Sequence, residues 1–244
     1  MEITYIGHSG FLMEWETCYW LFDYYKGEIP QLNPDKKLFI FASHQHADHF
    51  NPEIFNLGDK YPNVEYVLSS DIKMKNEYRN KAGQTDGMIR KIVSVKPSQE
   101  YKLEDANRDL IVLKTLKSTD CGVAFLLQYH GKTVYHAGDL NQWVWKEGTK
   151  QDNNNMTANF NKEMEELKDL LIDVAFAPLD PRQEEWYYLG LEKLLSSAKV
   201  RYVFPMHFWG RPEIIGQYKD ERSLYLYNAI IMDVCKDGQA WKIE

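Results

Sequence analysis

Four side chains that bind metal ions in proteins fall within the six-residue segment 44–49, which has the pattern H-x-H-x-D-H. In an extended segment, residues two apart point to the same side, so His44 and His46 can ligate one ion. A turn in the middle of the segment would direct Asp48 and His49 toward a second ion. Imidazole and carboxylate together suit a divalent metal, with zinc expected first and manganese or iron as alternatives. The competing interpretation is a loop of surface histidines.

The apolar run 38–42 directly precedes this segment and is typical of a strand that is buried on both faces. In α/β proteins, functional side chains follow the ends of such strands. Two more metal-competent side chains occupy this position: Asp139 after the predicted strand 133–136, and His207 after the predicted strand 201–205. Because four adjacent residues cannot enclose two ions, these two groups are the expected partners.

The rest of the chain is predicted to form strands first and alternating strands and helices afterwards. Helical spacing of apolar residues predicts helices over 161–171 and 189–197, and the polar stretch 150–155 is expected to be a loop too short to separate domains. We therefore expect a single α/β domain over 1–244, with two strand-rich layers inside and helices outside. The other predicted strands are 2–6, 11–15, 19–23, 64–68, 92–95, 101–103, 110–116, 123–129, 174–177 and 240–243.

Composition narrows the class of protein. Hydrophobic residues make up 44% and charged residues 27%, a balance that excludes a disordered chain. No apolar run approaches the roughly 18 residues of a membrane span, so no membrane partner is expected. The net charge of −7 argues against a nucleic-acid partner, because phosphate neutralisation needs a basic face.

The cellular location is inferred from the N-terminus and the cysteines. No basic leader opens the sequence, and Cys18, Cys121 and Cys235 are odd in number and far apart, which fits reduced thiols. We expect a cytoplasmic protein that acts on a small-molecule substrate. Aromatic residues make up 14% of the chain, which suits a ring-filled core or a pocket or interface, so the oligomeric state stays open.

In these residues the chain resembles the metallo-β-lactamase-fold hydrolase superfamily. The likeness runs over nearly the whole length, from the opening Gly-His-Ser at 7–9, through the segment 44–49, to Gly138-Asp139 and His207. The opening and the string Tyr-His-Ala-Gly-Asp at 135–139 resemble a branch of small cytosolic hydrolases that includes a sugar-acid lactonase. The resemblance implies an αββα four-layer sandwich of the metallo-β-lactamase type, with a binuclear metal site at one edge.

The resemblance also implies a role for each matching residue. It assigns the first ion to His44 and His46, and it assigns Asp139 as the bridge between both ions. The second ion would be held by Asp48, His49 and His207.

One expected ligand is missing from the sequence. The superfamily usually supplies a third histidine to the first ion, but the aligned stretch reads Ser118-Thr119-Asp120-Cys121. Asp120 is the natural substitute, since a carboxylate can complete the site. Cys121 is a thiolate alternative that would more simply be a small buried residue. His130 and His136 lie in the same interval, but outside the expected loop.

Several other side chains fit either a role in the site or a structural role. The resembling branch places His8 near the metal pocket, although a core histidine fits equally. Asp23 ends a predicted strand and could orient a ligand imidazole or simply occupy a turn. Three tryptophans could form the wall of a pocket or pack beneath the loops, and two cations could hold an anionic substrate or be merely solvated. These residues are Trp143, Trp145, Trp209, Lys146 and Arg211.

The expected activity is metal-dependent hydrolysis. A metal-bound hydroxide would attack an ester, lactone, amide or phosphoester of a small molecule, and Asp48 would orient it and carry a proton to the leaving group. A nuclease would need an added domain and a basic face, and a di-iron reductase would need a glutamate where His46 stands. The remaining alternative is a non-catalytic binding or scaffolding protein with a partly decayed metal site.

Overall fold

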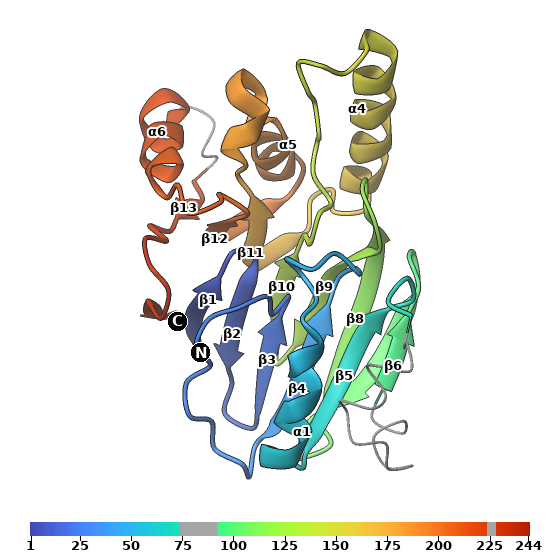
Figure 1. The fold of residues 1–244 in the computed structure, drawn as a ribbon, viewed down its shortest axis with the longest axis vertical. Coiled ribbons are helices and arrows are strands. Elements are labelled where there is room, and N and C mark those ends of the chain that lie inside the picture. Colours follow the sequence, from blue (N-terminus) through green and yellow to red (C-terminus); the bar gives the residue numbers. More distant parts are fainter. Residues whose placement is uncertain (74–91, 224–227) are drawn as a thin grey trace.

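Two seven-stranded sheets pack face to face in the computed structural model, which describes residues 1–73, 92–223 and 228–244 (Figure 1). The first sheet has the order β14-β1-β2-β3-β4-β5-β6, and the second has the order β13-β12-β11-β10-β9-β8-β7. The first comprises β1 (Glu2–Gly7), β2 (Gly10–Glu14), β3 (Cys18–Phe22), β4 (Lys37–Ala42), β5 (Val64–Ser69), β6 (Ile92–Val95) and β14 (Ala240–Lys242). The second comprises β7 (Glu100–Glu104), β8 (Leu110–Lys117), β9 (Val123–Tyr129), β10 (Lys132–His136), β11 (Leu171–Pro178), β12 (Lys199–Met206) and β13 (Ile230–Ile231).

Strand β3 shows why the first sheet is buried on both faces. Successive side chains of a strand point to opposite faces. Trp20 and Phe22 join the cluster between the sheets, whereas Tyr19 and Leu21 join a second cluster beneath the helices. The continuous apolar run at 38–42 behaves in the same way in β4. These runs therefore form inner strands of a sandwich, as the sequence predicts.

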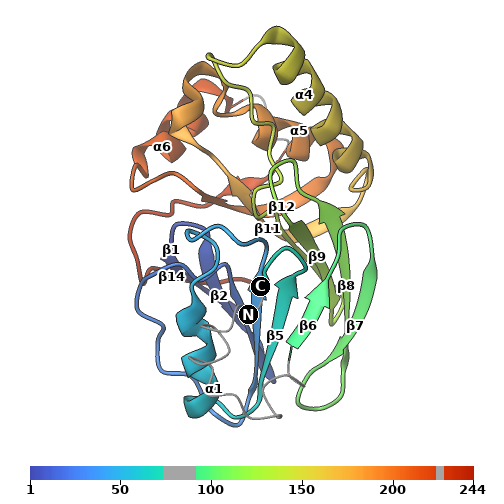
Figure 2. The same ribbon diagram turned by 45° about the vertical axis from the view of Figure 1, so that its right-hand side comes forward.

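Helices cover the outer face of each sheet (Figure 2). The 3-10 helix η1 (Pro52–Asn56) and α1 (Leu57–Lys60) lie against the first sheet, where the ring of Phe55 packs 5.0 Å from that of Tyr66. The second sheet is covered by α4 (Lys150–Glu165), α5 (Leu189–Ser197) and α6 (Glu213–Glu221), with the 3-10 helix η2 (Pro181–Trp186) before α5. The predicted αββα sandwich is confirmed.

The prediction of a loop at 150–155 is wrong, because these residues form the first turns of α4. The side chain of Thr149 accepts a hydrogen bond from the backbone N–H of Asp152 and caps the helix, while Phe160 and Met164 bury its apolar side. The predicted helix over 161–171 also extends too far. Asp169 has a left-handed backbone (φ 59°) and Leu171 begins β11. A cap and two buried side chains thus outweigh a run of poor helix formers.

The ends of three strands meet at one edge of the sandwich. Strand β10 is parallel to β11, and β11 to β12, so the residues that follow these strands emerge side by side. Gly138 allows this edge to approach the end of β4 closely, since a Cβ at this position would lie 2.6 Å from the Cβ of Ser43.

Within the described ranges, no helix combines the length and the apolar composition that crossing a lipid bilayer requires.

A buried carboxylate far from this edge ties the two sheets together. Asp105, between β7 and β8, accepts hydrogen bonds from Thr17 Oγ1, from the Tyr129 hydroxyl (2.7 Å) and from the backbone N–H groups of Asn107 (2.9 Å) and Asp109 (2.7 Å). Burial alone would raise the pKa of Asp105, but these donors lower it below its usual value. The ionised carboxylate is therefore the stabilised form.

We expect Asp105→Asn to lower the free energy of unfolding at pH 7 by about 2–4 kcal/mol, because hydrogen bonds to a charged acceptor contribute about 1.5–3 kcal/mol each. A carboxyl with a lowered folded pKa stabilises the fold above its unfolded pKa of about 3.9, and this contribution is lost as the pH falls through the folded pKa. The Tm difference between wild type and variant should therefore shrink below about pH 4. Thermal unfolding across pH tests this, with the exposed neighbour Asp109→Asn as control; a constant difference would contradict it.

Candidate metal centre

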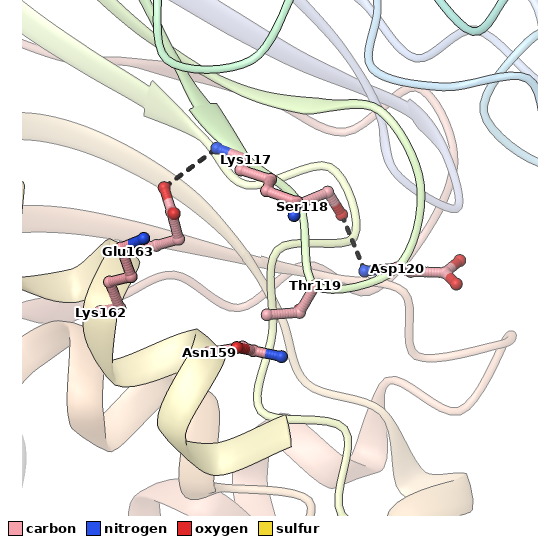
Figure 3. A pocket seen from close by; sticks show the side chains of 7 residues that line it. All are labelled: Lys117, Ser118, Thr119, Asp120, Asn159, Lys162 and Glu163. Carbon is pink, nitrogen blue, oxygen red and sulfur yellow. Dashed lines mark hydrogen bonds between the residues drawn. The ribbon is translucent and has the colours of Figure 1, made fainter. Parts of the chain in front are cut away.

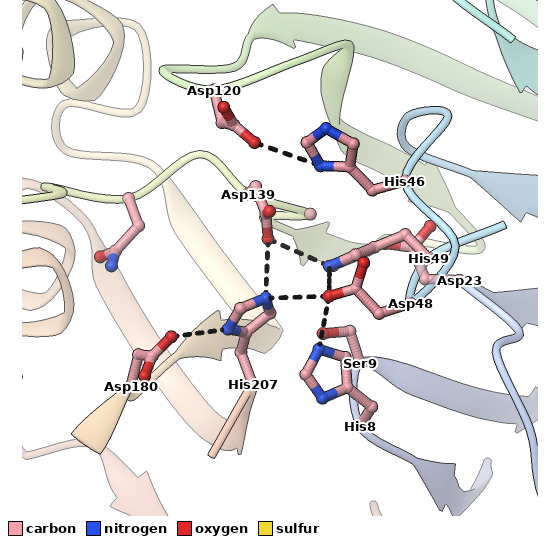
Figure 4. A network of polar contacts seen from close by, with 12 residues as sticks. His8, Ser9, Asp23, His46, Asp48, His49, Asp120, Asp139, Asp180 and His207 are labelled. Atoms are coloured by element: carbon pink, nitrogen blue, oxygen red, sulfur yellow. Dashed lines mark hydrogen bonds and ion pairs between the residues drawn. The ribbon is translucent and has the colours of Figure 1, made fainter. Parts of the chain in front are cut away.

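An inner group of metal-competent atoms lies at the meeting edge of the strands (Figure 4). His8, Asp48, His49 and His207 each place one ligand atom within 4.8 Å of the others. Asp48 Oδ2 lies 3.2 Å from His8 Nε2 and 3.8 Å from both His49 Nε2 and His207 Nε2. The three imidazoles are buried. The structure thus brings His8 into the site with three of the residues proposed from the sequence.

An outer group lies next to it and contains the remaining proposed residues. His44, His46, Asp120 and Asp139 also place ligand atoms within 4.8 Å of one another. His46 Nδ1 lies 3.0 Å from His44 Nε2 and 3.4 Å from Asp120 Oδ2. The side chains of His46 and Asp120 are 46% and 41% exposed, so these two residues face the solvent, whereas His44 and Asp139 are buried. Asp120 stands where the third histidine was expected.

Asp139 connects the two groups through its two carboxylate oxygens. Oδ1 lies 3.1 Å from His49 Nε2 and 3.3 Å from His207 Nε2, in the inner group. Oδ2 lies 3.5 Å from His44 Nε2, in the outer group. A carboxylate that faces two clusters of imidazole nitrogens in this way has the arrangement that a bridging ligand requires.

The site fits divalent cations because several of its buried polar atoms lie close to one another without forming hydrogen bonds. Four buried atoms lack a hydrogen-bond partner among the described residues: the Nε2 atoms of His8, His49 and His207, and Oδ1 of Asp139. Burying unpaired polar atoms costs about 1–3 kcal/mol each, so such a cluster needs a compensating ligand. Imidazole nitrogens and carboxylate oxygens that converge on a common point supply a donor set that zinc accepts.

Buried carboxylates behind the imidazoles orient them. The Nδ1–H of His49 donates to Asp23 Oδ2 (2.7 Å), and that of His207 donates to Asp180 Oδ2 (2.9 Å). Both carboxylates are completely buried. Each bond fixes the tautomer and leaves Nε2 free to face the centre of the site. Asp23 therefore orients an imidazole, which is one of the two roles that the sequence suggests for it.

The orientation of His44 depends on a relay through Ser43. The Ser43 hydroxyl donates its proton to Asp23 Oδ2 (2.7 Å), so its oxygen accepts from His44 Nδ1 at 3.0 Å. His44 Nε2 then carries a lone pair toward Asp139. One buried carboxylate, Asp23, thus orients an imidazole in each group.

The sequence interpretation missed Asp180. It follows β11, which lies between β10 and β12, and so it emerges between Asp139 and His207. The available signal was a carboxylate directly after the apolar run 174–179, the same position that identified Asp139. Only the strand order shows that it faces His207.

The charges at the site favour ionised carboxylates. Burial alone would raise the pKa of Asp139, but the charges of His49 and His207 lower it well below its usual value. Burial alone would lower the pKa of His49, but Asp139 and Asp23 raise it well above its usual value. Burial lowers the pKa of His44 and of His8. Because imidazole binds a metal ion in its neutral form, we expect metal affinity to fall on acidification.

Two histidines in the interval before Asp139 lie outside both groups. His136 is a core histidine: its Nε2 donates to the Ser9 carbonyl (3.0 Å), its Nδ1 accepts from the Gly138 N–H (3.1 Å), and its ring stacks on Phe22. His130 lies in the hairpin turn between β9 and β10, 3.4 Å from Asp109. Neither replaces the missing ligand.

The other candidates separate into neighbours of the site and solvated side chains. Cys121 is partly buried, burial raises the pKa of its thiol, and it belongs to neither group. Lys146 and Arg211 are exposed and pair with Glu184 and Glu213 at 3.5 and 3.3 Å. All three tryptophans lie close to the site. The ring of Trp143 lies 5.5 Å from that of His207, Trp209 lies 4.6 Å from His8, and Trp145 stacks on Trp143.

The loop that carries Asp120 separates two cavities. A polar cavity of about 230 Å³ lies between this loop and α4, and its lining includes Lys117, Lys162 and Glu163 (Figure 3). The Asp120 carboxylate points away from these residues, toward His46. A second cavity of about 210 Å³ is lined by Asp120 and Asp139 together with Trp143 and Trp145. Only the second cavity reaches a residue shared with the inner group.

Comparisons with known proteins agree with the fold and the site. A sequence model of the β-lactamase superfamily domain matches residues 2–154. A UPF0173 metal-dependent hydrolase of Opitutus terrae is 27% identical over 225 residues, which cover 88% of this chain and 87% of the relative. The metallo hydrolase Igni18 from Ignicoccus hospitalis superposes with a TM-score of 0.64 at 16% identity, over 100% of this chain and 99% of its own. The diiron β-hydroxylase CmlA from Streptomyces venezuelae gives a TM-score of 0.62 at 10% identity, over 99% of this chain and 54% of CmlA.

The fold likeness extends to a hydrolase and to a hydroxylase, so the fold by itself does not select the reaction. The sequence match is more specific, since it covers well over half of the chain and includes the segment 44–49 and Asp139. The chain therefore belongs to the β-lactamase superfamily.

Proposed function

We propose that this protein is a metal-dependent hydrolase with a binuclear centre, which cleaves an ester, lactone, amide or phosphoester of a small molecule. The observation that carries the proposal is the position of Asp139, whose two oxygens face two groups of imidazoles with unpaired nitrogens. The Opitutus terrae relative, described as a metal-dependent hydrolase, supports the same reaction class. The donor set favours zinc, with manganese or iron as alternatives.

The residues divide between two ions. His44, His46 and Asp120 would hold the outer ion, and Asp48, His49 and His207 the inner ion, with Asp139 shared by both. Two divalent cations in such a site polarise the bond under attack and lower the pKa of a coordinated water toward neutrality. Asp23 and Asp180 orient the imidazoles that would hold these cations.

Asp48 would carry the proton of the reaction. Its carboxylate is 24% exposed, and its Oδ2 faces three imidazole nitrogens of the inner group. Burial alone would raise the pKa of Asp48, but the neighbouring imidazole of His8 and the charge on His49 lower it well below its usual value. The ionised carboxylate can orient the attacking water, accept its proton and pass that proton to the leaving group. His8, 3.2 Å away, positions this carboxylate.

Metal content per chain is the test of this proposal. We expect about two ions per chain by elemental mass spectrometry of protein purified without chelators, as a binuclear site requires. In Asp120→Ala we expect about one, because the outer group loses one of its two exposed ligands while the inner group stays complete. The exposed Asp35→Ala is the matched control and should keep two.

The other outcomes are equally informative. An unchanged ion count in Asp120→Ala would remove Asp120 from the ligand set. About one ion in the wild type would contradict the binuclear centre. Near zero would favour a binding or scaffolding protein with a partly decayed metal site.

A further inference from the structure

The cavity beside the outer group has a distinctive lining. It holds about 210 Å³ and is bounded by the carboxylates Asp120 and Asp139 of the proposed metal site. The remaining walls include two indole rings, a thioether and a guanidinium, from Trp143, Trp145, Met156 and Arg182. Pockets that bind drug-sized ligands have volumes of about 300–1,000 Å³, so this smaller cavity suits only a small group.

Hydrogen bonds hold both tryptophans of the cavity in place, one through its ring and the other through its backbone. Trp143 Nε1 donates to the Asp139 carbonyl at 2.9 Å. The backbone of Trp145 is bound on both sides by the Asn153 side chain of α4, which accepts from its N–H (3.1 Å) and donates to its carbonyl (2.8 Å). The two rings are parallel within 1°, with centroids 5.8 Å apart. The stacked rings form a rigid aromatic wall of the cavity, and such preorganisation lowers the entropy cost of binding a flat group.

Arg182 contributes a planar surface rather than a free positive charge. Its Nε lies 3.0 Å from both oxygens of the buried Asp180 carboxylate, and its Nη2 lies 2.6 Å from Oδ2. The guanidinium carbon lies 4.4 Å from the Trp209 ring centroid and 5.8 Å from that of Trp145. Because its charge is compensated by Asp180, Arg182 favours a stacked group over an anion.

We infer that this cavity binds a small planar unsaturated group of the substrate, such as an aromatic or heteroaromatic ring next to the bond that is cleaved. The inference rests on the hydrolase function proposed above and narrows its substrate class. Trp145 and Arg182 are the residues that select this group, and Met156 supplies a polarisable apolar contact. The reacting bond would then lie beside Asp139, because Asp139 lines the same cavity as the bound ring of the substrate.

Two carboxylate probes separate planarity from size and charge. Benzoate and cyclohexanecarboxylate carry the same anionic group and the same number of ring carbons, but only benzoate is flat. We expect zinc-loaded wild-type protein to bind benzoate about 2- to 12-fold more tightly by isothermal titration calorimetry, the range that aromatic contacts add to area burial. Trp145→Leu should bring this ratio close to 1, whereas Trp145→Phe should keep most of it.

A tryptophan outside the cavity provides the matched control. Trp241 lies in β14 with its ring 5.1 Å from that of Phe204, and Trp241→Leu should leave the ratio at its wild-type value. Circular dichroism checks that each variant is folded. If Trp145→Leu does not fold, the wild-type ratio still decides the question.

Equal affinity of the wild type for the two probes, no binding of benzoate, or an unchanged ratio in folded Trp145→Leu would overturn the inference. These titrations involve no turnover, so they are independent of the reaction. A normal ratio in a protein that hydrolyses none of the ester, lactone, amide and phosphoester panels would count against the proposed function alone. Hydrolysis without any preference for benzoate would count against the planar group alone.

Discussion

Asp139→Asn is expected to lose both ions and at least about 100-fold in hydrolytic rate. Changing a group that only orients a metal ligand typically costs about 10- to 100-fold in metal affinity or activity. Asp139 faces both groups directly, with Oδ1 3.1 Å from His49 Nε2 and Oδ2 3.5 Å from His44 Nε2. An amide keeps the shape of the carboxylate, but it removes the negative charge that two cations would share. Elemental analysis and assays with added zinc measure both effects.

The design of this test separates ligand loss from misfolding. Asp35→Asn makes the same chemical change in an exposed carboxylate of the loop before β4, outside both groups, and should keep both ions and full activity. Circular dichroism reports whether Asp139→Asn has the native fold. A folded Asp139→Asn that retains two ions would show that Asp139 is not the shared ligand. Loss of only one ion would assign the residue to a single group.

Asp48→Asn is expected to lower kcat by about 10²- to 10⁴-fold, the range typical of general acid–base groups. The amide can still offer an oxygen to the inner group, but it cannot accept a proton at neutral pH. Measured at saturating zinc, the loss should appear in kcat far more than in KM, because the effect belongs to the transition state. The assay uses whichever substrate of the panel the wild type hydrolyses fastest.

Excess zinc distinguishes proton transfer from simple weakening of the metal site. If Asp48 carries the proton, kcat of the variant should stay low at any zinc concentration, because the amide cannot accept a proton. If Asp48 only binds metal, excess zinc should restore kcat. His8→Gln is the companion variant: it removes the partner 3.2 Å from Asp48 Oδ2 and should change kcat less than Asp48→Asn does.

Much of the sandwich could be predicted because its strands are locally encoded. The ranges predicted for β6 and β9 coincide with the structure, and most of the others differ from it by one to three residues at their ends. Continuous apolar runs such as 38–42 are buried on both faces and are therefore easy to recognise. The first turns of α4 were missed because a cap at Thr149 and the burial of Phe160 stabilise residues with poor helix propensity.

Most of the candidate metal ligands could also be recognised from short segments of the sequence. The spacing within 44–49 and the positions of Asp139 and His207 after strands are features of short segments, and the structure places all of these side chains in the two groups. Asp120 was proposed as the substitute for the missing histidine from the order of residues before β9. Its contact with His46, at 3.4 Å, could not be predicted from the sequence.

The sequence alone determined which residue types are available for metal binding and which strands carry them, because strand-forming runs and short motifs depend on near neighbours in the chain. The tertiary structure decided how these residues are grouped. His8 had two equal interpretations until the ends of β1 and β12 came together and placed its ring 4.4 Å from that of His207. Asp180 acquired its role only because β11 lies between β10 and β12. Strand order in a sheet depends on contacts between residues far apart in the chain, and no local pattern encodes it.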